Sequence, residues 1–220
     1  MGVVLRFLLF LSAAGKVAAF LLWAFESSPL VSVACFCGPD LLILYHLLAP
    51  WAQGVCRVFT RFETGRPEIW LTIDDGPDQD DTPRILELLD RHRARATFFL
   101  IGERAARLPS LVAEILRRGH QVGHHTHTHP TRLFWCATSG RVNAELDDGL
   151  AALRRGGAHP RWFRPPVGIK NLFLAGALAK RDLVGVAWNV RSHDFKSRDP
   201  AEGVDRVMKA VRPGAIVLMH

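Results

Sequence analysis

The sequence is poor in cysteine and contains no CxxC pair. Its four cysteines are Cys35, Cys37, Cys56 and Cys136, and two of them lie in an apolar stretch. Neither a disulfide framework nor a thiolate metal site is therefore indicated. The HExxH motif and a second metal-binding cluster are also missing from the sequence, which argues against a zinc-dependent peptidase or nuclease.

A fingerprint of a nucleic-acid-binding domain is missing as well, although the formal net charge is +7 and the pI is near 9.8. The basic residues are scattered along the chain. We therefore expect no nucleic-acid partner, and we expect contact with acidic surfaces such as anionic lipid or cell-wall polymer. Hydrophobic residues make up 49% of the 220 residues, which is enough for a substantial core, so we expect one folded domain plus an appendage.

The appendage is an apolar N-terminal segment. The runs Val3–Phe25 and Pro29–Trp51 are each about long enough to cross a bilayer, which takes roughly 20 apolar residues. Lys16 and Asp40 interrupt them, and a charge near mid-membrane costs about 2.5–3.5 kcal/mol. No convincing A-x-A-like cleavage site follows. We predict a membrane-anchoring helical segment over residues 1–52 with one or two spans; a cleaved signal peptide and a soluble core are the alternatives.

Flanking charges bear on the topology of this segment. Arg6 precedes the first run, Glu26 lies between the runs, and Arg57, Arg61 and Arg66 follow the second. By the positive-inside rule a hairpin would keep both ends cytoplasmic, whereas a single span with Arg6 inside would export the rest of the chain. We expect attachment to the inner (cytoplasmic) membrane with the domain on the exported side, while the charges leave both topologies open.

After a linker at residues 53–67, short apolar runs alternate with helix-like stretches over residues 68–220. The predicted strands are Ile69–Ile73, Ala96–Ile101, Gln121–Gly123, Trp162–Arg164, Leu183–Val190 and Ala215–Met219. The predicted helices are Thr82–His92, Pro109–Arg118, Arg141–Arg155, Asn171–Arg181 and Ala201–Val211. This alternation predicts an α/β fold with a mainly parallel sheet or barrel and helices outside. In such folds the chemistry collects at the carboxyl ends of the strands.

Two adjacent carboxylates, Asp74 and Asp75, end the first of these strands before a Gly-Pro turn. Adjacent side chains on a strand point to opposite faces, so one carboxylate can bind a metal while the other works as a base. The alternative is a plain strand-to-helix loop in which an Asp caps the helix that begins near Thr82.

Five histidines occur in the ten residues from His120 to His129, which is too dense for ordinary core usage. His125 and His129 are four residues apart, so a helical turn would place both imidazoles on one face toward a single ion. His124 and His127 are rival ligands that the spacing does not exclude. Two histidines and one carboxylate form a familiar ligand set for a catalytic divalent metal.

Five motifs in this order resemble those of the NodB-type polysaccharide deacetylases, the carbohydrate esterase family 4 homology domain. They are Thr72–Pro77, Gly123–Pro130, Arg164–Gly168, Trp188–Phe195 and Leu218–His220. The resemblance implies a distorted (β/α) barrel that removes N-acyl groups from amino sugars in a metal-dependent hydrolysis. In this chain the barrel follows the apolar helical segment.

The resemblance also implies a role for each matching position. Asp75, His125 and His129 would hold the divalent metal, which we expect to be zinc, with cobalt or nickel as alternatives. Asp74 would be the general base that activates the attacking water. Arg164 would orient and acidify Asp74 through a charge-assisted pair.

The later motifs supply the other catalytic groups. By the same resemblance, His220 would be the general acid that protonates the departing amine, and Asp194 would hold its other ring nitrogen. The backbone N–H of Val167 would stabilise the oxyanion, and Pro166 and Phe195 would line the substrate groove. An imidazole suits the acid role because its pKa lies near neutrality.

Several positions depart from the family's pattern. His124 replaces a common Asn, Val167 an aromatic residue, Arg191 an acidic residue and Phe195 a Trp. These changes bear on the substrate more than on the reaction. The chain stops at His220, whereas family members usually continue with at least one more helix and strand, so we expect a C-terminally incomplete barrel whose activity is in question.

These observations predict a hydrolase of non-peptide carbon–nitrogen bonds that deacetylates the amino sugars of a peptidoglycan-like or chitin-like polysaccharide. The expected partners are an N-acetylated glycan and membrane lipid. Two alternatives stay open: a deacetylase or deformylase of a lipid-linked sugar, and a truncated, non-catalytic module that binds metal or glycan.

Overall fold

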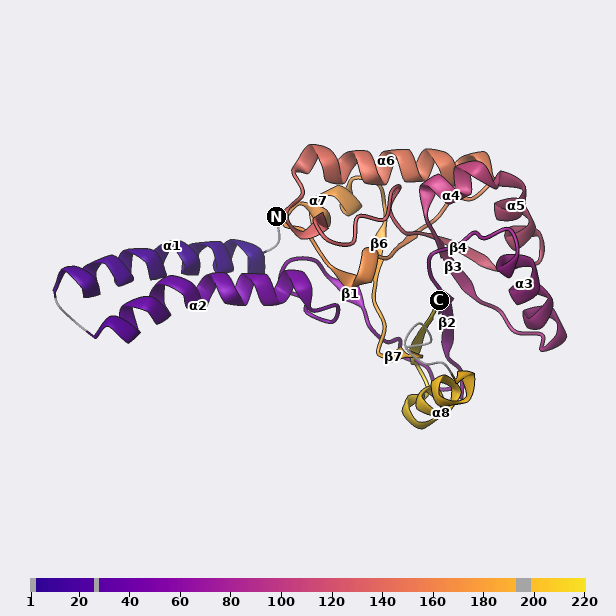
Figure 1. Ribbon diagram of the computed structural model, residues 1–220, viewed down its shortest axis with the longest axis horizontal. Helices are drawn as coiled ribbons and strands as arrows, with labels where there is room; N and C mark the ends of the chain where they lie inside the picture. Colours follow the sequence, from indigo (N-terminus) through magenta and orange to yellow (C-terminus); the bar gives the residue numbers. More distant parts are fainter. Residues whose placement is uncertain (1–2, 26–27, 193–198) are drawn as a thin grey trace.

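A pair of long helices projects from a larger α/β body in the computed structural model of the protein, which describes residues 3–25, 28–192 and 199–220 (Figure 1). The helices are α1 (Val3–Ala24), α2 (Pro29–Leu48), α3 (Asp81–Arg91), α4 (Gly102–Arg107), α5 (Pro109–Arg117), α6 (Ser139–Arg155), α7 (Leu174–Ala179) and α8 (Pro200–Ala210). Two 3-10 turns are η1 (Phe134–Cys136) and η2 (Pro166–Gly168). The strands are β1 (Val58–Phe59), β2 (Trp70–Ile73), β3 (Thr97–Leu100), β4 (Gln121–His124), β5 (Trp162–Phe163), β6 (Val184–Val186), β7 (Val190–Arg191) and β8 (Ile216–Met219).

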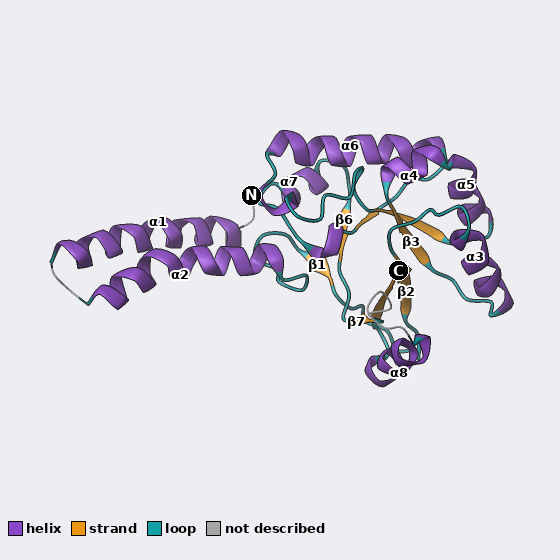
Figure 2. Ribbon diagram, viewed as in Figure 1, coloured by secondary structure: helices purple, strands orange, loops and turns teal. Residues whose placement is uncertain are grey.

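In the described residues the strands form one sheet in the order β1-β6-β5-β4-β3-β2-β8-β7, and neighbouring strands pair in parallel. The sheet curls into a half-barrel with helices along its outside (Figure 2). This confirms the predicted distorted (β/α) barrel. Because all strands run the same way, the residues that follow β2, β4, β5 and β8 open onto one edge of the sheet.

The core explains why these runs became strands and helices. All four residues of β3 are buried, as expected for a central parallel strand that is covered on both faces. Leu86 of α3 and Val112 and Ile115 of α5 are completely buried in the same cluster as Phe98. α5 ends before Gly119, whose φ of 80° matches the left-handed cap expected there.

The predicted single strand Leu183–Val190 is wrong. The chain leaves the sheet after Val186 and returns as β7 on the opposite edge: β6 pairs with β1 and β5, whereas β7 pairs with β8. A continuous apolar run is compatible with one long strand or two short ones, so periodicity alone could not separate them. Helix α4 was also absent from the prediction. The other predicted elements are present, with ends that differ by a few residues.

The helices α1 and α2 pack side by side as a hairpin (Figure 1). The two charges that interrupt their apolar sequences pair with each other, since Lys16 Nζ lies 2.8 Å from Asp40 Oδ2. The Ser12 hydroxyl donates a hydrogen bond to Asp40 Oδ1. Both helices are long and apolar enough to cross a membrane, which is compatible with a membrane anchor or a signal sequence.

Candidate active site

The carboxyl end of β2 carries Asp74 and Asp75. Asp74 is buried, and its N–H donates to the Met219 carbonyl of β8 at 3.0 Å, which continues the strand pairing. Asp75 leaves the strand with a left-handed φ of 69°. Neither carboxylate caps α3, because Asp78 Oδ1 accepts from the first N–H groups of that helix at 2.9 and 3.0 Å. An Asp does cap the start of α3, as the alternative expected, but it is Asp78 and not a member of the Asp74–Asp75 pair.

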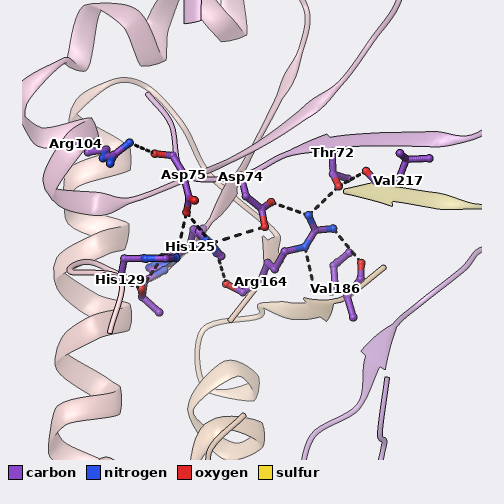
Figure 3. Close-up of polar contacts among 12 residues, drawn as sticks. Thr72, Asp74, Asp75, Arg104, His125, His129, Arg164, Val186 and Val217 are labelled. Carbon is purple, nitrogen blue, oxygen red and sulfur yellow. Dashed lines mark hydrogen bonds and ion pairs between the residues drawn. The ribbon is translucent and has the colours of Figure 1, made fainter. Parts of the chain in front are cut away.

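Asp74 is held by Arg164, a residue with no solvent exposure that follows β5. Arg164 Nη1 donates to Asp74 Oδ1 at 2.7 Å and to Thr72 Oγ1 at 2.8 Å, while Nη2 donates to the Ala187 carbonyl at 3.0 Å (Figure 3). The guanidinium carbon lies 4.2 Å from the centre of the Phe99 ring. The Asp74 carboxylate is therefore fixed by a buried, charge-assisted pair whose cation is itself satisfied.

Asp75, His125 and His129 converge on one point. Asp75 Oδ1 lies 3.4 Å from His125 Nε2 and 3.1 Å from His129 Nε2, and the three candidate ligand atoms lie within 4.8 Å of one another (Figure 3). Asp74 Oδ2 lies 3.8 Å from the same nitrogen of His125. Two imidazoles and one carboxylate at such distances are able to share a divalent cation.

The contacts of His125 and Asp75 agree with a cation at this point. His125 Nδ1 lies 2.7 Å from the Arg164 carbonyl, which can only accept, so Nδ1 carries the hydrogen and Nε2 directs its lone pair at the cluster. Asp75 Oδ1 is buried without a hydrogen-bond partner among the described residues.

The two histidines do not converge through a helical turn, as the four-residue spacing suggested. Residues 125–129 form an irregular loop in which Thr126 and His129 adopt positive φ values of 64° and 57°. The ring centroids of His125 and His129 nevertheless lie 4.8 Å apart. His125 and His129 are therefore brought together by an irregular backbone conformation rather than by a helical turn. Such a conformation needs stabilising contacts from outside the loop.

Glu145 of α6 supplies that support, and sequence reasoning missed it. Its carboxylate is buried and accepts from the N–H groups of His127 and Thr128 at 2.9 and 2.8 Å and from the Thr128 hydroxyl at 2.6 Å. Arg141 pairs with it at 2.5 Å. The available signal was the position of Glu145 beside the fully buried Leu146, on the apolar face of a predicted helix.

The rival ligand His124 is used elsewhere. It is completely buried, its Nδ1 accepts from the Thr126 N–H at 2.9 Å, and its Nε2 donates to the Leu146 carbonyl at 3.0 Å. Burial lowers the pKa of His124 to about 4, so the ring stays neutral. Gly149 lets α6 approach, because a Cβ there would come within 2.6 Å of the His124 ring. Among the described residues the candidate metal group does not include His124 or His127.

The remaining predicted residues surround this cluster to different extents. Pro166 is buried in η2, and Val167 beside it is 44% exposed with a φ of 48°. His220 is exposed and directly follows β8, the strand that pairs with β2. Asp194 and Phe195 lie outside the described residues. The structure therefore brings together one carboxylate pair, two histidines and an arginine from three different motifs.

Comparisons with known proteins identify the family and the fold. A family model described as polysaccharide deacetylase matches residues 62–183. Chitooligosaccharide deacetylase from Bradyrhizobium sp. (strain ANU 289) is 38% identical over 159 residues, which cover 71% of this chain and 72% of that protein. A solved peptidoglycan N-acetylglucosamine deacetylase is similar with a TM-score of 0.70 and 29% identity, over 78% of this chain and 79% of that one. A family 4 carbohydrate esterase pseudoenzyme from Bacillus anthracis has a TM-score of 0.69 and 29% identity, over 74% of this chain and 58% of its own.

Proposed function

The chain belongs to the polysaccharide deacetylase family, hydrolases of non-peptide carbon–nitrogen bonds, and we propose that it is a metal-dependent N-deacetylase of N-acetylglucosamine-containing glycans. The observation that carries this proposal is the convergence of Asp75, His125 and His129 beside the ion-paired Asp74. A chitin-like or peptidoglycan-like substrate is favoured because similar proteins are named for these two glycans.

Asp75, His125 and His129 would hold the cation. Their donor set of two imidazole nitrogens and one carboxylate oxygen suits zinc, and also cobalt or nickel. The buried Asp75 oxygen without a hydrogen bond supports this assignment. When bound, such a cation polarises an amide carbonyl and lowers the pKa of water toward neutrality.

Asp74 would act as the general base. Its Oδ1 is tied to Arg164, while its Oδ2 lies on the side of the cluster, 3.8 Å from His125 Nε2. The carboxylate cannot turn away without breaking a buried ion pair, so one oxygen stays aimed at the position of the attacking water. Arg164 is thus a positioning residue for the base.

The other groups follow from the later motifs. His220 would protonate the departing amine, with Asp194 holding its second ring nitrogen. Val167 lies in a left-handed turn three residues after Arg164, and its N–H would donate to the developing oxyanion. Pro166 and Phe195 would line the groove for the sugar.

For the chain as a whole we propose a membrane-anchoring hairpin at residues 1–52 and a catalytic domain at 68–220. The predicted linker at 53–67 joins them and also adds β1 to the sheet of the domain. The pairing of Lys16 with Asp40 supports insertion because neither charge is left alone in the apolar helices. The expectation that the domain lies on the exported side applies to a single membrane span. A hairpin leaves both ends on one side, and the basic residues Arg6 and Arg57 at these ends favour the cytoplasmic face of the inner membrane.

Acetate release from N-acetylglucosamine oligomers tests the catalytic proposal. We expect the full chain in detergent micelles to release acetate, a chelator to abolish the release, and zinc to restore it. Asp74→Asn should abolish turnover while zinc still binds, because it removes the base and leaves the three ligands. A zinc-loaded chain that releases no acetate from any amino-sugar oligomer would overturn the proposal.

Similarity to a pseudoenzyme favours one alternative, a glycan-binding module without turnover. Binding of zinc and oligomer without acetate release would identify that module. A binding titration performed on the same preparation as the acetate assay therefore separates the two functions.

A further inference from the structure

The base of the α1–α2 hairpin is joined directly to the turn η2. The Lys170 N–H donates to the Leu47 carbonyl at 2.7 Å, and its ammonium donates to the carbonyls of Ala49 and Pro50 at 2.5 and 3.2 Å. Lys170 is completely buried. Gly168 of η2 lies against the same segment, because a Cβ there would come within 2.6 Å of Pro50 Cβ. The turn η2, which would border the proposed substrate groove, therefore lies directly beside the end of the hairpin.

A second segment is tied to this joint by the next residue. Asn171 is 1% exposed, and its Nδ2 donates to the carbonyls of Phe134, Trp135 and Ala137 at 2.9, 3.3 and 2.8 Å. The η1 segment therefore lies beside residues 167–173. Lys170 joins residues 167–173 to the end of α2, and Asn171 joins them to η1.

These neighbouring segments expose large apolar side chains. Trp51, Leu133, Trp135 and Phe173 are 60%, 69%, 38% and 47% exposed, and we call these four residues the collar. Several large apolar side chains exposed on segments that are bonded to one another indicate an interaction site rather than ordinary surface. Trp51 also donates to the Tyr45 hydroxyl at 3.1 Å, and tryptophan and tyrosine at the end of an apolar helix are typical of a membrane–water interface.

We propose that the collar lies in the lipid interface and holds the catalytic groove at the bilayer surface, where the amino sugar is presented on a membrane lipid. The inference rests on the proposed membrane attachment and on the proposed deacetylation. The bilayer is the occupant because the collar is continuous with the apolar hairpin. The exposed Arg132, next to Leu133, suits lipid phosphates. Exposed Val167 directly precedes Gly168, which packs against Pro50 at the end of the hairpin, so the proposed groove begins beside the collar and a substrate at the interface would reach it.

Lipid quenching tests the position of the collar. In a full chain whose Cys35, Cys37 and Cys136 are replaced by serine, a fluorophore is placed on L133C and, as a matched control, on V204C. Val204 is 61% exposed on α8, away from the hairpin (Figure 1). In phosphatidylcholine–phosphatidylglycerol vesicles with brominated acyl chains, we expect loss of fluorescence at position 133 and none at position 204. Equal quenching at the two positions would overturn the proposal.

Turnover gives an independent readout. We expect L133S/W135S to lose about tenfold in rate on a lipid-linked N-acetylglucosamine oligomer in vesicles, as the loss of two interfacial anchors would produce. Its rate on a soluble oligomer in micelles should be unchanged, and V204S/M208S should match the wild type on both substrates. An equal loss on both substrates would show a structural role for Leu133 and Trp135 and would overturn the proposal.

The three levels of inference fail in distinguishable ways. A chain that does not float with vesicles refutes the attachment and the collar together. A chain that floats while position 133 stays unquenched refutes the collar alone. A zinc-loaded chain that is quenched at position 133 but releases no acetate refutes the catalytic function and supports the collar.

Discussion

Replacement of Glu145 by alanine removes the carboxylate that ties the histidine loop to α6. Its Oε2 accepts from the N–H groups of His127 and Thr128, and its Oε1 accepts from the Thr128 hydroxyl. The Glu145 side chain is 1% exposed, so water has little access to replace these bonds. Arg141, by contrast, is 54% exposed; it pairs with the same carboxylate and donates one hydrogen bond to Thr128 Oγ1 at 2.9 Å.

The expected costs follow from these contacts. An orphaned buried donor costs about 1–3 kcal/mol and a hydrogen bond to a charged group contributes about 1.5–3 kcal/mol, so losing the acceptor of two backbone N–H groups should lower the free energy of unfolding by about 3–5 kcal/mol. Glu145→Gln keeps one oxygen for both N–H groups but loses the charge and replaces the acceptor of the Thr128 hydroxyl by an NH2 donor, which should cost about 1–2 kcal/mol. Arg141→Ala breaks an exposed pair and should cost at most about 1 kcal/mol.

Zinc affinity separates positioning of the loop from stability, because His129 is carried on the loop that Glu145 holds. We expect Glu145→Ala to weaken zinc binding by about 10–100-fold, as for other residues that orient metal ligands. Arg141→Ala should weaken it far less, because it removes one exposed hydrogen bond to Thr128 and leaves the Glu145 contacts in place. Competition with a chromophoric chelator measures this, and denaturant unfolding of the metal-free chain measures stability. If Glu145→Ala lost stability but bound zinc as tightly as Arg141→Ala, the positioning role would be refuted.

Three further outcomes follow from charges that are buried or lie in the apolar helices. Arg164→Met should lower the free energy of unfolding by about 3–5 kcal/mol because it leaves the buried Asp74 carboxylate without its cation. Adding Asp74→Asn to this variant should restore part of the lost free energy, and a double variant whose cost in denaturant unfolding equals the sum of the two single costs would contradict this expectation. Burial lowers the pKa of Lys170 to about 8, so between pH 8 and 9 the unfolded chain binds more protons at this residue and its contribution to stability should rise with pH. The denaturation midpoint in micelles should rise between pH 8 and 9 in the wild type and should not rise in Lys170→Met. The same pH dependence in both chains would contradict the role assigned to Lys170. In the hairpin, Lys16→Met leaves the Asp40 charge without its cation, at a cost of about 2.5–3.5 kcal/mol for insertion into the membrane. Alkaline extraction should therefore release more of this variant from membranes than of the double variant that also carries Asp40→Leu.

Short-range patterns were sufficient for the fold class, the family and most of the candidate site. The alternation of apolar runs with helical stretches predicted the parallel barrel, and parallel strands place their carboxyl ends on one edge by geometry. Asp74, Asp75, His125, His129 and Arg164 could therefore be collected from separate motifs before their distances were known. Their catalytic and metal-binding roles stay predictions.

Contacts between residues far apart in the chain decided the rest. One apolar run is divided into β6, which lies between β1 and β5, and β7, which lies at the far edge of the sheet. This division depends on which strand each piece pairs with, and a local pattern does not contain that information. The pairing of Lys16 with Asp40, which turns two unfavourable charges into one neutral pair, likewise requires two helices to lie side by side.

From the sequence alone came the residue types, their order and the strand ends at which they lie. Only the tertiary structure decided which imidazoles face Asp75. Both ring nitrogens of His124 are hydrogen-bonded, to Thr126 and Leu146, while the loop held by Glu145 turns His129 toward Asp75. The physical reason is that a buried polar group takes whichever partner packing brings to it, and that partner is set by the fold rather than by sequence spacing.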